Sequence, residues 1–254
     1  MIKTNKLTII SHLEELRWVF IRSIIYLIIA GIISFFFVDQ IINFIKLPSK
    51  DIINGFFILK PTDSIVIYFK SIMYGAFVLA FLPIIYEVIN FIRPALQREY
   101  AWFVLKWTLS AVILFLAGTL FVYFVVLPVA VKFLTDLAQT LISSNSQVSF
   151  NAYISFVLML LLCGGIIFQI PLISAMLTML NIISPFVLRK FRKEMFFGLC
   201  IFSAVITPTT DVFSMMLFVL PMIVLYEIGI IISDTIYKQR TSETEQIYDG
   251  GKYD

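Results

Sequence analysis

The sequence is poor in charged side chains. Only 14% of its 254 residues are charged, whereas 60% are hydrophobic, and a soluble domain is about a quarter charged. The chain therefore has more apolar side chain than one soluble core of this size can hide. This excludes a soluble catalytic domain and a disordered protein. The net charge of +3 gives no support for nucleic-acid binding.

Histidine and cysteine are also scarce. His12 is the single histidine, so a histidine metal cluster cannot be built, and we expect no metal and no cofactor. The two cysteines, Cys163 and Cys200, lie in apolar runs, as is typical of buried thiols. His12 is predicted at the membrane surface, far from both cysteines, so no nucleophile and base pair emerges.

Motifs for nucleotide or metal chemistry are missing as well. The chain has no HExxH, no P-loop and no glycine-rich dinucleotide motif. Gly118 and the Gly164-Gly165 pair are typical of close helix packing rather than of ligand cradles. An enzyme is therefore not predicted.

Long apolar runs take the place of these features. A membrane helix needs about 20 mostly apolar residues, and charged residues separate six candidate runs. These are residues 23–38, 71–92, 107–131, 152–180, 195–210 and 212–233. The predicted fold is all-α: a polytopic membrane protein with six transmembrane helices in one domain, residues 1–240, followed by a disordered cytoplasmic tail, residues 241–254.

Lysine and arginine predict the orientation. Fourteen of them fall on the side of the two termini and five on the other side, so both termini should face the cytoplasm. The long outer loops, residues 39–67 and 132–151, should form short helices. The fifth run has 16 residues and spans about 24 Å, less than the roughly 30 Å of a hydrocarbon core. We therefore expect a cupped, concave arrangement rather than a closed pore.

Two acids on the predicted cytoplasmic side lack an obvious structural task. Ser11 and Glu14 have capping-box spacing, which predicts a helix start at Ser11. In that arrangement Glu14 has a structural role as a capping residue. Glu15 has no such local role, and is either a solvated interfacial charge or part of a site. Glu99 lies among three bases and is either a loop salt-bridge partner or part of a site.

Polar residues inside the membrane are costly and therefore suggest function. Glu87 and Glu227 lie near the inner interface, where each can snorkel or pair with a base without further function. Gln169 lies near the middle of the fourth run, before Pro171, and needs a hydrogen-bond partner across helices. We expect it to line the concavity, facing lipid or a partner helix.

At these residues the sequence resembles the TatC family, the polytopic subunit of the twin-arginine protein translocase. The resemblance runs from about Ser11 to Ser233. The matching motifs are His12-Leu13-Glu14-Glu15-Leu16-Arg17, Phe91-Ile92-x-Pro94-x-Leu96-x-x-Glu99, Gly118-x-x-Phe121-x-Tyr123 with Leu127-Pro128, Phe168-Gln169-Ile170-Pro171, Thr207-Pro208-Thr209-Thr210-Asp211 and Leu225-Tyr226-Glu227.

The resemblance implies the site residues. The family's two signal-binding glutamates map to Glu15 and Glu99. The remaining assignments are Leu16, Arg17, Phe91 and Pro94 around the signal peptide, Gln169, Glu87 and Glu227 as intramembrane polar or partner-docking positions, and Pro48, Asp63, Tyr123, Pro128, Pro208 and Asp211 as structural or outer-loop positions.

The resemblance also implies the function. It predicts binding of twin-arginine signal peptides of folded proteins, export driven by the proton-motive force, and small single-span partners of the TatA and TatB types. Self-association and a multi-pass location in the cytoplasmic (inner) or an organellar membrane follow in the same way. The chain departs from the family at Gln169, often Glu, at Glu87, often Gln, and in an outer turn that is one residue longer.

Two other functions are open on the residues alone. A secondary transporter of a small solute would need internal repeats and a midplane cluster of ion ligands, and only Gln169 is found there. An intramembrane enzyme would need a nucleophile and a base at one depth, and no such pair is present.

Overall fold

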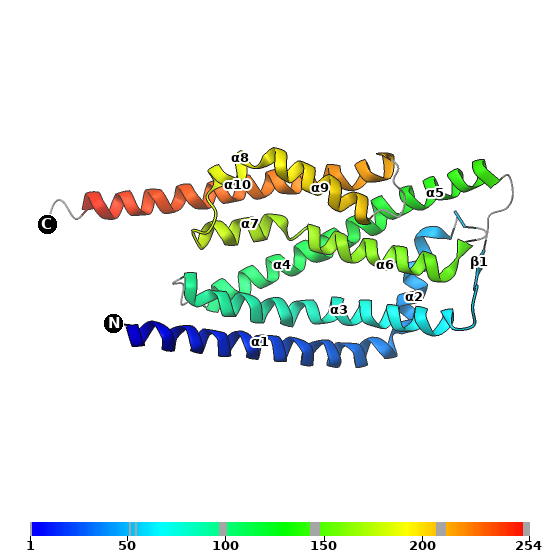
Figure 1. Ribbon diagram of the computed structural model, residues 1–254, viewed down its shortest axis with the longest axis horizontal. Helices are drawn as coiled ribbons and strands as arrows, with labels where there is room; N and C mark the ends of the chain where they lie inside the picture. The colour runs from blue at the N-terminus through cyan, green and yellow to red at the C-terminus, as the bar shows by residue number, and fades with distance from the viewer. Residues whose placement is uncertain are drawn as a thin grey trace. The chain divides into compact units, whose positions relative to one another are not determined.

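The computed structural model describes residues 2–50, 52–53, 55–96, 101–142, 148–206 and 212–250. The chain forms two compact units, one of residues 1–113 and 120–162 and one of residues 114–119 and 163–254. Nearly all regular structure is helical (Figure 1), as the predicted all-α class requires.

Two long helices form one side of the first unit. Helix α1 (Ile2–Phe36) and helix α3 (Asp63–Ile92) run side by side in opposite directions (Figure 1). Ala30, Ala76 and Ala80 form a buried cluster between them. Small residues at a helix contact let the two backbones approach closely. The predicted helix start at Ser11 is wrong, because α1 begins at Ile2 and residues 2–10 contain no proline or glycine to end it.

The first long loop contains short helices, as predicted. Helix α2 (Val38–Lys46) is followed by the 3₁₀ turn η1 (Leu47–Ser49). Val38, Ile42 and Ile45 form the buried stripe of α2. Near its end, the carbonyls of Phe44 and Ile45 accept hydrogen bonds from the hydroxyls of Tyr123 and Tyr153 at 2.8 and 2.9 Å.

The third apolar run is one long helical segment with a local widening. Helix α4 (Ala101–Phe121), the π-helical turn η3 (Val122–Val126) and helix α5 (Leu127–Ile142) follow each other without a break. Pro128 lies at the start of α5 and has no N–H, and its ring would clash with the carbonyl four residues earlier. A π turn directly before a proline removes that clash.

Polar side chains join the start of α3 to helix α6 (Phe150–Ile167). The buried carboxylate of Asp63 accepts bonds from the Lys60 N–H at 3.1 Å and from Asn151 at 3.0 Å. Lys70 donates to Asn151 at 3.1 Å and to Ser155 at 2.6 Å. Nearby, the two-residue strands β1 (Phe56–Phe57) and β2 (Val148–Ser149) pair in parallel. These interactions hold the two long loops against the helix ends.

The second unit is built on helices α7 (Ile170–Met179), α8 (Pro185–Lys190), α9 (Arg192–Ile206) and α10 (Val212–Gly250). Helices α7 and α10 pack on each other, and α6 is separated from α7 by a break at Phe168-Gln169. The predicted turn after Leu180 is confirmed, with Asn181 at φ 57° and Ser184 capping α8. The backbone of α10 is helical to Gly250, beyond the predicted start of the tail at residue 241.

Five helices are long and apolar enough to cross a membrane in the described ranges. They are Leu13–Phe36, Asp63–Ile92, Trp102–Leu137, Phe150–Met179 and Met215–Gln239. The predicted fifth span corresponds to α9, whose 15 residues extend about 22 Å. Five of the six predicted spans thus have suitable helices, and the count of six and the orientation of the termini stay predictions.

Cysteine labelling tests the orientation. Lys50 and Lys190 are both exposed and are predicted on opposite sides of the membrane. In a variant without Cys163 and Cys200, we expect Lys50→Cys to react with an impermeant maleimide in intact cells, and Lys190→Cys only after permeabilisation. The reverse labelling pattern would contradict the predicted orientation, in which both termini face the cytoplasm.

Candidate functional site

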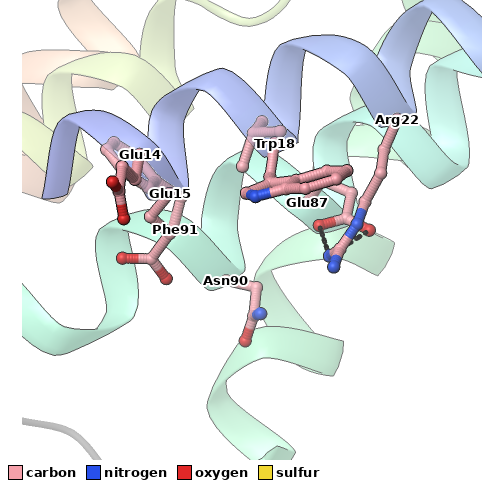
Figure 2. Close-up of a pocket in the computed structure, with 8 residues that line it drawn as sticks. Glu14, Glu15, Trp18, Arg22, Glu87, Asn90 and Phe91 are labelled. Atoms are coloured by element: carbon pink, nitrogen blue, oxygen red, sulfur yellow. Dashed lines mark hydrogen bonds and ion pairs between the residues drawn. The ribbon is translucent and has the colours of Figure 1, made fainter. Parts of the chain in front are cut away.

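The first unit contains a pocket between α1 and α3. Its volume is about 320 Å³. It lies where α1 has completed its first turns and α3 approaches its last residues (Figure 2). The lining residues are Glu14, Glu15, Trp18, Val19, Arg22, Glu87, Asn90 and Phe91.

Helical periodicity brings these side chains together. Along α1, Glu15, Trp18 and Arg22 follow each other at three- and four-residue steps, which place them on one face. Along α3, Glu87 and Asn90 have the same spacing. Because α1 and α3 run in opposite directions, the two polar stripes face each other over about two turns.

An ion pair closes one end of the pocket. The Arg22 guanidinium donates to both carboxylate oxygens of Glu87, at 3.2 and 3.4 Å, and the Tyr26 hydroxyl donates to one of them at 3.0 Å. Glu87 is 7% exposed, so removing either donor would leave a buried charge less well satisfied. The prediction that Glu87 can pair with a base is confirmed, and the pair fastens α1 to α3.

The described part of the lining is acidic. Among the described residues it holds the carboxylates of Glu14, Glu15 and Glu87 and the guanidinium of Arg22. Glu14 and Glu15 lie at one end, the ion pair lies at the other, and the Trp18 ring lies between them (Figure 2). Like charges in a concave site of reduced dielectric strengthen the attraction for ions of opposite sign. The chemistry of the pocket therefore suits a cationic ligand.

The predicted signal-peptide residues are only partly brought together. Glu15 and Phe91 line the pocket. Leu16 and Arg17 are exposed on α1, and Pro94 is exposed in the 3₁₀ turn η2 (Arg93–Leu96) that ends α3; these three are outside the lining. Three predicted residues lie outside the described part of the chain: Glu99, Pro208 and Asp211.

Five contributors were not predicted from the sequence. Trp18, Val19, Arg22 and Asn90 line the pocket, and Tyr26 holds Glu87. The spacing of Glu15, Trp18, Arg22 and Tyr26 along one helix face was the available signal. Glu14 also lines the pocket. The prediction that Glu14 only caps a helix is wrong, because α1 does not begin at Ser11.

In the second unit, charged residues on α8 and α9 pair with charged residues on α10. Glu227 accepts from Arg192 at 2.7 Å, and Arg189 pairs with Asp234, so the prediction that Glu227 can pair with a base is confirmed. Gln169 is 7% exposed. The expectation that Gln169 faces lipid is therefore wrong, and its assignment as a partner-docking position stays a prediction.

Comparison with known proteins decides the family. A sequence model described as TatC, Sec-independent protein translocase protein, matches residues 11–221. The chain belongs to the TatC family. The Aquifex aeolicus Sec-independent protein translocase protein TatC is 34% identical over 226 residues, which cover 87% of this chain and 92% of that protein. Bacillus subtilis TatCy is 30% identical over 255 residues and 98% of both chains.

A solved TatC structure has the same fold. The crystal structure of the twin-arginine translocase receptor TatC matches with a TM-score of 0.80 and 34% identity, over 89% of this chain and 99% of that one. The chain is thus a membrane protein of the TatC type and a subunit of the twin-arginine translocase, a transport component rather than a catalytic enzyme.

Two of the positions assigned from the TatC resemblance, Tyr123 and Asp63, make contacts that involve the outer loops. Tyr123 stacks on Phe44 with ring centroids 4.3 Å apart and donates to the Phe44 carbonyl. Asp63 accepts the bonds at the start of α3 described above, Pro48 is half-buried in η1, and Pro128 follows the π turn. The contacts of Tyr123 and Asp63 position the loops.

Proposed function

We propose that this chain binds the arginine pair of twin-arginine signal peptides at the cytoplasmic face, with Glu15 from α1 and Glu99 from the segment after α3. The supporting observation is the acidic pocket between α1 and α3, which contains Glu15 and borders the end of α3. The segment that carries Glu99 begins directly after η2, which ends at Leu96. The connection is therefore short enough to bring a second carboxylate toward the pocket.

The proposed ligand fits the chemistry of the lining. A guanidinium presents a planar fork of N–H donors that matches a carboxylate bidentately, whereas an ammonium is a compact point charge. The Arg22–Glu87 pair shows that the same pocket already holds a guanidinium against a carboxylate, there through the single nitrogen Nη1. The cargo that carries the signal is folded, so the pocket has to read only a short extended segment.

The wider function follows the family. We propose that the chain works with single-span partners of the TatA and TatB types in the cytoplasmic membrane, and that the proton-motive force drives export. Gln169 carries no charge and is buried, so this position supports helix packing rather than proton transfer. Glu87 and Glu227 hold helices together through their arginine partners.

Export of a folded reporter tests the proposal. Cells that lack their own TatC and express this chain with its cognate small subunits should export a folded fluorescent protein behind an RR signal and not behind a KK signal. The charge and length of the two signals are the same, so the comparison isolates the guanidinium. Equal export of both, or of neither, while the chain is present in the membrane would contradict the proposal.

A further inference from the structure

The pocket contains an exposed aromatic ring in acidic surroundings. Trp18 is 59% exposed although it lines the pocket. Its ring lies between the end with Glu14 and Glu15 and the end closed by the ion pair (Figure 2). A cation drawn to this pocket therefore meets an open indole next to carboxylates.

Trp18 differs from the other exposed apolar residues on this part of α1. Leu16 and Phe20 are 48% and 67% exposed, yet neither lines the pocket. Exposed aromatics at a membrane surface commonly anchor a helix in the interface, and that accounts for Phe20. It does not account for an indole placed among three carboxylates, where contact with lipid would compete with a charged surface.

The neighbouring ion pair keeps its own guanidinium occupied. Arg22 bonds to both oxygens of Glu87, and Tyr26 adds a third bond. Glu87 is therefore already satisfied, and the carboxylates of Glu14 and Glu15 lie at the opposite end. An incoming cation bound at that end lies beside Trp18.

We propose that Trp18 adds to the preference of this pocket for arginine over lysine: one indole face stacks on a guanidinium of the ligand while the carboxylates at the Glu14 and Glu15 end accept its N–H groups. This inference rests on the proposed function, because it assumes that the pocket takes up a twin-arginine segment. The planar guanidinium stacks on an aromatic face and keeps its in-plane N–H groups for carboxylates, whereas an ammonium cannot do both.

Binding of synthetic peptides to the purified full-length chain in detergent tests the inference. The peptides are one signal sequence with RR and the same sequence with KK, and the variants are Trp18→Leu, Trp18→Phe and Phe20→Leu. We expect Trp18→Leu to weaken RR binding by about 2- to 5-fold, the usual size of an exposed cation–π contact, and KK binding by less. Trp18→Phe should fall between, and the matched control Phe20→Leu should bind both peptides as the unaltered chain does.

The outcomes separate the two proposals. If the unaltered chain does not prefer RR to KK, the proposed function fails. If the unaltered chain prefers RR and Trp18→Leu keeps the same RR to KK ratio, Trp18 is only an apolar or structural residue, and this inference is overturned. A fall in affinity for RR in Phe20→Leu as large as in Trp18→Leu would also overturn it, because the effect would then belong to the helix surface as a whole.

A second readout is available from the same residue. The chain has three tryptophans, so replacing Trp102 and Trp107 by Phe leaves Trp18 as the only indole. Its emission should change on titration with the RR peptide and stay constant with a peptide in which citrulline replaces both arginines. Saturable RR binding without any change in Trp18 emission would argue against stacking.

Discussion

Replacing Glu15 or Glu99 by alanine is expected to weaken binding of an RR signal peptide by roughly 10- to 150-fold. Each substitution removes one charge-assisted hydrogen-bonded pair, worth on the order of 1.5–3 kcal/mol. Glutamine keeps the shape but loses the charge, so Glu15→Gln and Glu99→Gln should also impair binding. The measurement is peptide affinity for the purified chain in detergent or in membranes.

Glu14 and Glu194 provide the comparisons. Glu14 lines the same pocket as Glu15, so Glu14→Gln should have a smaller but measurable effect through the charge of the lining. Glu194 is an exposed acid in the first turn of α9, and Glu194→Ala should bind the peptide normally. If the folded variants at positions 15 and 99 bind as the unaltered chain does, the two glutamates are not the arginine site.

Replacing Gly118 by alanine is expected to destabilise the second unit by about 1–3 kcal/mol. A Cβ at this position of α4 would lie 2.5 Å from the Gly164 carbonyl oxygen and 2.7 Å from Cγ of Phe168. The first neighbour is backbone, so it cannot rotate away, and two helices would have to separate. This cost exceeds the gain of roughly 0.5–1 kcal/mol that alanine normally brings to a helix interior.

The matched control is Gly198 in α9. An added Cβ there meets nothing within 4 Å, so Gly198→Ala should be neutral or slightly stabilising. Unfolding of both variants by denaturing detergent gives the comparison. Equal stability of the two would mean that the helix contact at Gly118 is looser than the structure shows.

Much of the architecture could be predicted because its signals are local. Charged residues bound the apolar runs, and four of the six correspond closely to long apolar helices. Most of the first run lies in the longer helix α1, which ends at Phe36, and the fifth run forms the shorter α9. The proline and asparagine signals after residue 180 marked a turn, and Asn181 and Ser184 form it. Gly118 was correctly taken as a packing point. The apolar runs and the turn depend on residues close together in the sequence, and glycine is a packing signal by itself because it has no side chain.

The same locality explains the errors. The capping-box pattern at Ser11 and Glu14 does not begin a helix, because the helix already runs through the residues before it. Gln169 was expected to face lipid or a partner helix because of its polarity alone. That expectation did not include the residues that pack around it in the fold. Pro171 breaks the helix just before it, and the residue is buried in the fold.

By itself the sequence determined that this is an all-α membrane protein with TatC motifs and an acidic residue in the first of them, because composition, run length and motif spacing are properties of the chain alone. Only the tertiary structure decided that Glu87 is held by Arg22, 65 positions away, and that Trp18 borders the same pocket. Those contacts depend on the register between α1 and α3, which is set by the packing of Ala30 against Ala76 and Ala80 and is not encoded in either helix separately.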